Sequence, residues 1–227
     1  MLLSTVWEHV KSRTVQIHNP LRKDRATLTR AWTHPFGIKL KQFDAIMRPD
    51  GAEGCLLSHS KVAQLYEAPY VVLEDDAVPT NEANYSTELI ASLHEIMKQK
   101  FDIIYLGGLP IQASSTSFPG IYTGQCWTTY AMIVGPKAAQ YLKTLKYENV
   151  PVDVLLARQS FNCAIVDPPL FRQAITPSEI GKSRFTKSLF FSRALASVGP
   201  VWRFAVLKSG YLMVLVLFLG ILVGMLK

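Results

Sequence analysis

Three consecutive acidic residues, Glu74, Asp75 and Asp76, stand directly after the apolar run 70–73 (YVVL). Such a run predicts a buried strand, and ligands in open α/β sheets bind at the carboxyl ends of strands. If the chain stays extended, Glu74 and Asp76 share a face. Carboxylates this close repel each other unless a cation relieves them, and oxygen ligands favour Mn²⁺ or Mg²⁺. The pattern predicts a metal site at Glu74, Asp75 and Asp76; the alternative is an exposed acidic turn that caps the next helix.

A second pair of chemically suited residues is Ser58 and His59, in the segment 54–59 (GCLLSH). We expect both to lie one turn into a helix, where backbone N–H groups and the helix dipole attract anions. The pair therefore predicts an anion-binding position, and the alternative for His59 is an ordinary surface histidine.

Asp153 is the third candidate, because it follows Pro151 and Val152 just ahead of a predicted helix. A carboxylate in that position serves either as the N-cap of the helix or as a general base that takes a proton from an acceptor hydroxyl. The spacing alone leaves both roles open.

The elements that must position these residues follow from hydrophobic periodicity. Strands are predicted at 14–18, 38–46, 70–73, 101–106, 129–134 and 163–166, and helices at 26–32, 54–67, 84–100, 137–145 and 152–160, with a loop at 109–128. Strands that alternate with helices predict an α/β domain with a largely parallel sheet. We place this domain at residues 12–181.

The net charge of +7 is concentrated in the C-terminal part of the chain. All 17 acidic residues lie at or before Glu179, and the basic residues beyond Gly181 are Lys182, Arg184, Lys187, Arg193, Arg203, Lys208 and Lys227. Residues 1–181 are therefore neutral overall, which disfavours nucleic acid as a partner. A basic stretch beside an apolar segment favours anionic lipid instead.

The apolar segment itself, 209–226, is 18 residues without a charge. At about 1.5 Å per residue a helix of this length spans about 27 Å, close to the roughly 30 Å hydrocarbon core of a bilayer. It is apolar on every face, which argues against a core helix of so small a domain and against an interfacial helix. We therefore predict a single transmembrane anchor at 209–226 and a basic juxtamembrane connector at 182–208. By the positive-inside rule the catalytic domain is expected on the cytoplasmic side.

The three cysteines, Cys55, Cys126 and Cys163, are far apart and odd in number, with no CxxC pair. This spacing predicts free, partly buried thiols rather than a disulfide framework, and it fits a reducing compartment.

The motifs together resemble glycosyltransferase family 25, the lipopolysaccharide-type galactosyl- and glucosyltransferases. The resemblance covers roughly residues 15–182, in matching order and spacing. It rests on VQIHNPLRKDR (15–25), GAEGCLLSHSKV (51–62), PYVVLEDDAVP (69–79), FDIIYLGG (101–108), TYAMIVGPKAAQYL (129–142), PVDVLL (151–156) and PPLFRQAITPSEIGKS (168–183). The LSH and LEDD blocks occurring together make the resemblance fairly specific.

This resemblance implies a GT-A type, Rossmann-like nucleotide-sugar-binding fold, a UDP-sugar donor, a divalent metal (Mn²⁺ or Mg²⁺) and inversion at the anomeric carbon. It implies transfer of a hexose, galactose or glucose, to a hydroxyl of a glycan or glycolipid acceptor. By position, the implied residues are the metal ligands Glu74, Asp75 and Asp76; the donor-binding residues Asn19, Arg25, Ser58, His59, Glu74 and Asp75; and the catalytic base Asp153. The segment 109–128 has no clear family pattern.

Two other functions remain open at the level of the sequence. One is a metal-dependent nucleotidyl- or phosphotransferase that uses the same acidic strand end, although its P-loop version is excluded because no GxxxxGK[ST] segment occurs. The other is a catalytically inactive, glycosyltransferase-like protein that serves as a membrane-bound binding or scaffold module.

The anchor prediction is tested by fractionation. The full-length chain should stay with the membrane after carbonate extraction, whereas a chain ending near Gly181 should be soluble. Detergent-free solubility of the full-length chain would contradict the anchor and would require the apolar tail to be buried in an oligomer.

Overall fold

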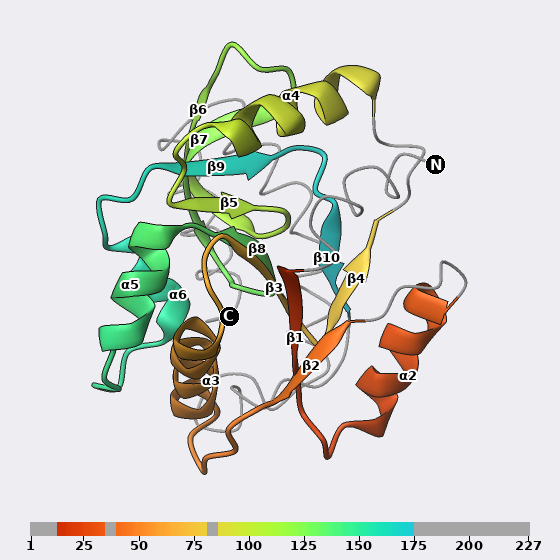
Figure 1. The fold of residues 1–227 in the computed structure, drawn as a ribbon, viewed down its shortest axis with the longest axis vertical. Coiled ribbons are helices and arrows are strands. Elements are labelled where there is room, and N and C mark those ends of the chain that lie inside the picture. Colours follow the sequence, from red (N-terminus) through yellow and green to blue (C-terminus); the bar gives the residue numbers. More distant parts are fainter. Residues whose placement is uncertain (1–12, 35–39, 81–85, 175–227) are drawn as a thin grey trace, which may run out of the picture.

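The computed structural model describes residues 13–34, 40–80 and 86–174 of the 227-residue chain. These residues form one mixed β-sheet with helices on both faces (Figure 1). Within the described ranges no helix has the length and apolar character needed to cross a bilayer. The predicted anchor at 209–226 and the connector at 182–208 lie outside the described residues.

The main sheet has eight strands in the order β2-β1-β3-β8-β5-β9-β7-β6. Their bounds are β1 Thr14–His18, β2 Lys41–Asp44, β3 Tyr70–Glu74, β5 Ile103–Tyr105, β6 Leu109–Ser115, β7 Ile121–Trp127, β8 Ala131–Val134 and β9 Cys163–Val166. A separate antiparallel pair is formed by β4 (Ala77–Pro79) and β10 (Phe171–Gln173). Neither strand of this pair was expected from the sequence, because three residues are too few to show a period.

The sheet is rich in parallel pairs but mixed, so the prediction of a largely parallel sheet needs correction. β1 pairs in parallel with β2 and β3, and β5 does so with β9. β8 runs antiparallel to both of its neighbours, β3 and β5. Strand direction depends on partners distant in the chain, which a local hydrophobic pattern does not contain.

The segment 109–128, predicted as a loop, contains the antiparallel hairpin β6–β7. Its two glycines and its many small polar residues hide the strand pattern, because β6 is an edge strand with one partner and several exposed side chains. Gly124 has a φ of +154°, and a Cβ there would lie 2.0 Å from the Gln112 carbonyl oxygen, so the hairpin admits glycine alone at this point.

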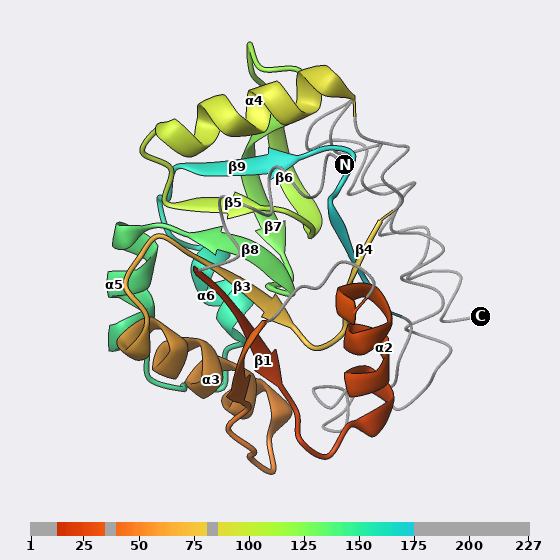
Figure 2. The same ribbon diagram turned by 45° about the vertical axis from the view of Figure 1, so that its right-hand side comes forward.

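Two helical layers cover the two faces of the sheet (Figure 2). Helices α3 (Gly51–Leu65), α5 (Pro136–Thr144) and α6 (Val152–Ala157) pack on the face that carries Tyr70 and Val72. Helix α4 (Thr87–Lys98) packs on the opposite face, with Val71 and Leu73. This alternation along β3 is the reason the strand reads as an unbroken apolar run.

Helix α2 (Lys23–Thr33) lies on the same face as α4, because its Trp32 packs against the Val71 and Leu73 cluster. The side chain of Gln16, in β1, donates a hydrogen bond to the Thr29 hydroxyl at 2.8 Å and ties the helix to the sheet.

Capping residues set two helix starts that periodicity placed elsewhere. The Asp50 side chain accepts a hydrogen bond from the Ala52 N–H, so α3 begins at Gly51 rather than at 54. The Ser86 hydroxyl accepts from the Leu89 N–H, so α4 begins at Thr87 rather than at 84. The three cysteines are free, as predicted.

The connections β1–α2–β2 and β2–α3–β3 leave the sheet toward opposite faces, since α2 and α3 belong to different layers. The strand order reverses at β1, which lies between β2 and β3. In open α/β sheets such a reversal opens a crevice at the carboxyl ends of the central strands. The fold therefore places a crevice after His18 and Glu74, where the predicted site residues begin.

Candidate active site

A cavity of about 460 Å³ lies at the carboxyl ends of β1, β2 and β3. Seven of the eight site residues predicted from the sequence line it: Asn19, Arg25, Ser58, His59, Glu74, Asp75 and Asp76. The remaining lining residues that matter here are Leu21, Arg22, Met47, Arg48, Gly54, Cys55 and Gln173. The topology thus gathers residues up to about 150 positions apart onto one wall.

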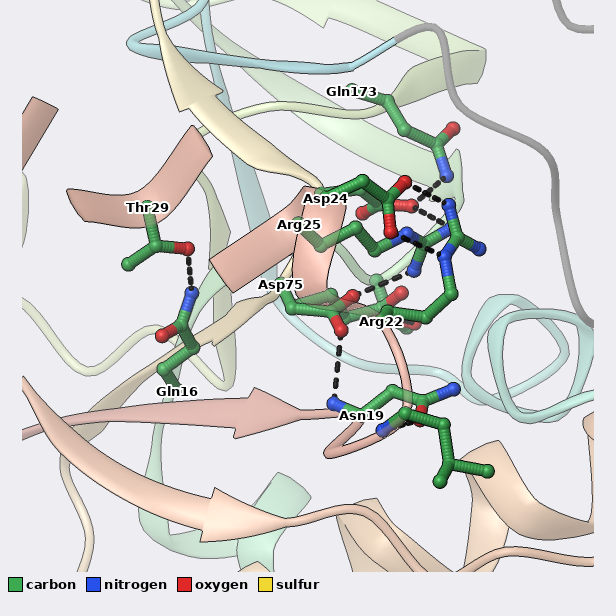
Figure 3. Close-up of polar contacts among 12 residues, drawn as sticks. Gln16, Asn19, Arg22, Asp24, Arg25, Thr29, Asp75 and Gln173 are labelled. Carbon is green, nitrogen blue, oxygen red and sulfur yellow. Dashed lines mark hydrogen bonds and ion pairs between the residues drawn. The ribbon is translucent and has the colours of Figure 1, made fainter. Parts of the chain in front are cut away.

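Arg25 is the central contact of this wall (Figure 3). Its guanidinium is buried and lies 2.6 Å from Asp75 Oδ1 and 3.2 Å from Asp76 Oδ2. Asp75 Oδ2 accepts a hydrogen bond of 2.9 Å from the backbone N–H of Asn19. Asp75 therefore has a partner on each oxygen, and it fixes the turn after β1 and the start of α2 to the end of β3.

Asp76 differs from its neighbour in having one oxygen to spare. Its Oδ2 accepts from the Gln173 amide at 3.1 Å, while its buried Oδ1 has no hydrogen-bond partner among the described residues. Burial raises the pKa of Asp76 to about 6; Arg25 opposes the rise, and the charges of Glu74 and Asp75 add to it. A buried carboxylate oxygen of this kind is suited to a cation or to a hydrogen-bond donor of a ligand.

Glu74 faces a different set of partners, because the chain turns at Asp75 and Asp76 instead of staying extended. One of its oxygens lies 3.3 Å from His59 Nε2 and accepts from the Thr129 hydroxyl at 2.7 Å. Burial alone would raise the pKa of Glu74, but these two contacts and the charge of Arg25 outweigh it and lower the pKa. The expectation that Glu74 and Asp76 share a strand face is therefore wrong.

Ser58 and His59 were expected one turn into the helix, but they lie in the third turn of α3. The N–H groups there are bonded within the helix, so the predicted anion site at a helix start is wrong for this pair. His59 is 1% exposed, which also excludes the surface-histidine alternative. Its ring meets Glu74 at the cavity wall.

Ser58 fastens the loop between β2 and α3. Its hydroxyl accepts from the Ile46 N–H at 2.8 Å and donates to the Gly54 carbonyl at 2.7 Å. A Cβ on Gly54 would lie 2.6 Å from the Ile46 carbonyl oxygen, so only glycine permits this close approach of loop and helix. These contacts shape the cavity wall that Met47 and Arg48 share.

Asp153 is the predicted site residue that does not line the cavity. It lies inside the first turn of α6, whose N-cap is Pro151, so the prediction of Asp153 as the N-cap is wrong, although its Oδ1 accepts from the Val154 N–H of the same turn at 2.9 Å. Asp153 Oδ2 accepts from the Thr128 N–H at 3.1 Å, where Thr128 has a φ of +71°. The carboxylate thus holds the turn that presents Thr129 to Glu74.

Sequence reasoning missed several wall residues. Arg22 and Arg48 add positive charge, Gln173 reaches in from β10, and Cys55 stands one helical turn before His59. The spacing of Cys55 and His59, four apart on a predicted helix, was the one local signal available. Gln173 had none, because its strand was not predicted.

Comparisons with known proteins add little to this geometry. No known protein family matches the sequence, and no curated protein is significantly similar to it. The fold is similar to the crystal structure of HddC from Yersinia pseudotuberculosis, with a TM-score of 0.37 and 9% identity over 67% of each chain. It is also similar to mannose-1-phosphate geranyltransferase from Thermus thermophilus, with a TM-score of 0.27 and 12% identity over 73% of this chain.

The matched region covers 47% of the Thermus protein, so this chain spans about half of that structure. At such TM-scores the two structures say nothing about what this chain binds. Membership of glycosyltransferase family 25 therefore stays a prediction from the motifs.

The buried ion pairs predict a sharp difference between two arginines of one segment. Arg25→Met leaves Asp75 and Asp76 without their counter-charge and should lower the free energy of unfolding by about 3–5 kcal/mol. Arg22→Met removes a pair with the half-exposed Asp24 and should cost less than about 1 kcal/mol. Urea denaturation of both variants in chelated buffer measures the difference, and equal losses would contradict the assigned role of Arg25.

Proposed function

We propose that this protein is a metal-dependent, inverting glycosyltransferase that moves a hexose, galactose or glucose, from a UDP-sugar to a hydroxyl of a glycan or glycoconjugate. The observation that carries the proposal is the mixed charge of a single cavity at the strand-order reversal. Three arginines line that cavity, together with a carboxylate oxygen of Asp76 that has no hydrogen-bond partner in the described part of the chain. Such a combination suits a diphosphate accompanied by a cation.

The acidic residues fit a hard divalent ion, Mn²⁺ or Mg²⁺, through Asp76 and Glu74. Asp76 Oδ1 is buried and has no partner among the described residues, which is the feature expected of a vacant ligand oxygen. Asp75 has a partner on each oxygen, so in this proposal it holds Arg25 and the Asn19 turn in place. When bound, the ion would supply positive charge that stabilises UDP as the leaving group.

Arginine side chains give the cavity its affinity for phosphate. Arg22 and Arg25 come from the start of α2, and Arg48 comes from the loop before α3. One guanidinium can donate two parallel hydrogen bonds to two oxygens of a phosphate, which orients the phosphate as well as neutralising its charge. Asn19 and Ser58 hold the backbone of these segments in place through the hydrogen bonds described above. In this proposal they position the arginines and do not contact the donor themselves.

Two apolar side chains stand at the rim of the same cavity. Leu21 is 75% exposed and Met47 is 41% exposed, although both are large and hydrophobic. They lie on the β1–α2 and β2–α3 connections, next to the arginines. We assign them to the apolar faces of the nucleoside, whose burial would be favourable by the hydrophobic effect.

Acceptor activation is assigned to Asp153 as general base. Its support is that Asp153 is half-buried and acts electrostatically on Cys55, which lines the cavity. Its Oδ2 accepts from the Thr128 N–H at 3.1 Å and its Oδ1 from the Val154 N–H at 2.9 Å, so an acceptor hydroxyl would use a remaining lone pair of one of these oxygens. Inversion follows if the hydroxyl attacks the face opposite to UDP.

The second candidate function is a catalytically inactive, glycosyltransferase-like binding protein. The specific observation in its favour is that Asp153 lies outside the cavity lining. In both candidates we propose that residues 209–226 anchor the protein, with this domain on the cytoplasmic side next to a membrane-bound acceptor.

A donor screen tests the proposed function. The full-length protein in detergent should hydrolyse or transfer at least one UDP-hexose, and EDTA should abolish that turnover. Asp76→Asn should lower turnover by about 10²–10³-fold because it removes the charged ligand oxygen. Asp44→Asn is the matched control: it makes the same change at the exposed end of β2, which is separated from β3 by β1, and it should leave turnover unchanged.

Turnover that survives EDTA would overturn the metal role. Donor binding without turnover for every UDP-hexose would overturn the enzyme in favour of the binding protein. Release of UMP, with the hexose 1-phosphate moved to the acceptor, would identify a phosphotransferase. Release of hexose 1-phosphate, with UMP moved to the acceptor, would identify a nucleotidyltransferase.

Asp153→Asn separates the two roles of this residue. Asparagine keeps one oxygen that accepts from the Thr128 N–H, loses the acceptor for the Val154 N–H and lacks a base, so kcat should fall by roughly 10²–10⁴-fold with the donor Kd unchanged. Normal kcat in this variant would make Asp153 a positioning residue for the turn at Thr128.

A further inference from the structure

A cysteine, a histidine and a carboxylate meet at the wall of the cavity, on the α3 side of the acidic residues. The ligand atoms of Cys55, His59 and Glu74 all lie within 4.8 Å of one another. Cys55 and His59 are four residues apart on α3 and so share one helix face. Glu74, the last residue of β3, approaches that face from the sheet.

We propose that Cys55, His59 and Glu74 form a binding site for a borderline divalent cation of the zinc type. The reason is the chemistry of the set: thiolate sulfur, imidazole nitrogen and one carboxylate oxygen are the three ligand types that proteins use for Zn²⁺. Mn²⁺ and Mg²⁺ prefer all-oxygen sets, which this trio does not supply. The site thus differs in kind from the oxygen site proposed at Asp76.

The spacing of the ligands agrees with a tetrahedral ion. Zinc bonds of about 2.0–2.1 Å to nitrogen and oxygen imply an N···O edge of about 3.3 Å. The distance between His59 Nε2 and Glu74 Oε1 is 3.3 Å. The Cys55 sulfur lies within the 4.8 Å that encloses all three ligand atoms, and its side chain is half-buried.

Two further features favour the ion. Burial, and then the charges of Glu74, Asp153 and Asp76, raise the pKa of the Cys55 thiol, and a cation beside the sulfur would offset both by its own positive charge. The Thr129 hydroxyl donates to Glu74 at 2.7 Å and orients the carboxylate from outside the ligand set, as outer partners of metal ligands do. On binding, the thiol releases its proton to solvent and the sulfur forms the bond to the ion.

Three protein ligands leave a fourth position of the ion open, and all three ligands line the cavity. A bound ion would therefore face whatever occupies the cavity. Because Glu74 belongs to both ligand sets, Zn²⁺ at this site competes with Mn²⁺ for one carboxylate. The proposal goes beyond the proposed transferase function and stands whether or not the protein turns over a UDP-sugar.

Cobalt spectroscopy on the full-length protein tests the site, with Co²⁺ alone as the probe. Titration should produce a sulfur-to-cobalt charge-transfer band and the visible bands of four-coordinate Co²⁺, both removed by one equivalent of Zn²⁺. Cys55→Ser should abolish the sulfur band, and His59→Gln should weaken Co²⁺ binding by more than about tenfold.

Two controls separate this site from its neighbours. Cys163→Ala removes a buried thiol on β9 outside the cavity, and Asp76→Asn removes the proposed oxygen site; both should keep the sulfur band. Circular dichroism confirms that each variant is folded. Absence of the band in the unmodified protein, or its survival in Cys55→Ser, would overturn the proposal.

Discussion

The buried ion pairs of Arg25 with Asp75 and Asp76 are the interaction on which the arrangement of this site depends. Three successive carboxylates at one strand end cannot all be charged and buried without a counter-ion. Arg25 supplies that charge from the first turn of α2 and so pins the helix to the end of β3. The Asn19 N–H completes the connection through Asp75, and the cavity forms between the segments held in this way.

One guanidinium does not neutralise the acidic residues, and this surplus of negative charge organises the chemistry. Asp76 keeps a buried oxygen without a partner in the described part of the chain, and Glu74 draws His59 to itself. Each of these features suits a further cation: an oxygen-preferring ion at Asp76 and a zinc-type ion at Glu74 and His59. On one side of Glu74 the cavity wall offers the carboxylate oxygen of Asp76. On the other side it offers the sulfur of Cys55 and a ring nitrogen of His59.

The topology of the sheet explains why these residues meet. Because α2 and α3 leave toward opposite faces, the ends of β1 and β3 stay uncovered between them. The antiparallel β8 then brings its first residues to the end of β3, where Thr129 contacts Glu74. Asp153 holds the turn before Thr129, which links α6 to the same carboxylate. The β4–β10 pair closes the other side through Gln173.

Local patterns in the chain were sufficient for the elements that are buried or periodic. The run 70–73 became β3, Cys163–Val166 became β9 with the predicted bounds, and the amphipathic segments became α3, α4 and α5 within a few residues. These patterns hold because burial of both sheet faces demands apolar runs, and burial of one helix face demands a period of 3.6. The motif blocks also placed seven site residues around one cavity.

What each of those residues does was decided by partners far along the chain. Asp75 and Asp76 are neighbours of the same type, yet Asp75 has a partner on each oxygen while one oxygen of Asp76 has none within residues 13–34, 40–80 and 86–174. The difference arises because Asn19 and Gln173 come from opposite ends of the domain. Distant segments also decide three other features. These are the burial of His59, the pairing of the β6–β7 hairpin and the contact of Asp153 with Thr128. The sequence by itself determined the buried strands, the amphipathic helices and the chemical types at the strand ends. Only the tertiary structure decided which oxygen, nitrogen and sulfur atoms face one another, since packing and register between distant segments set those contacts.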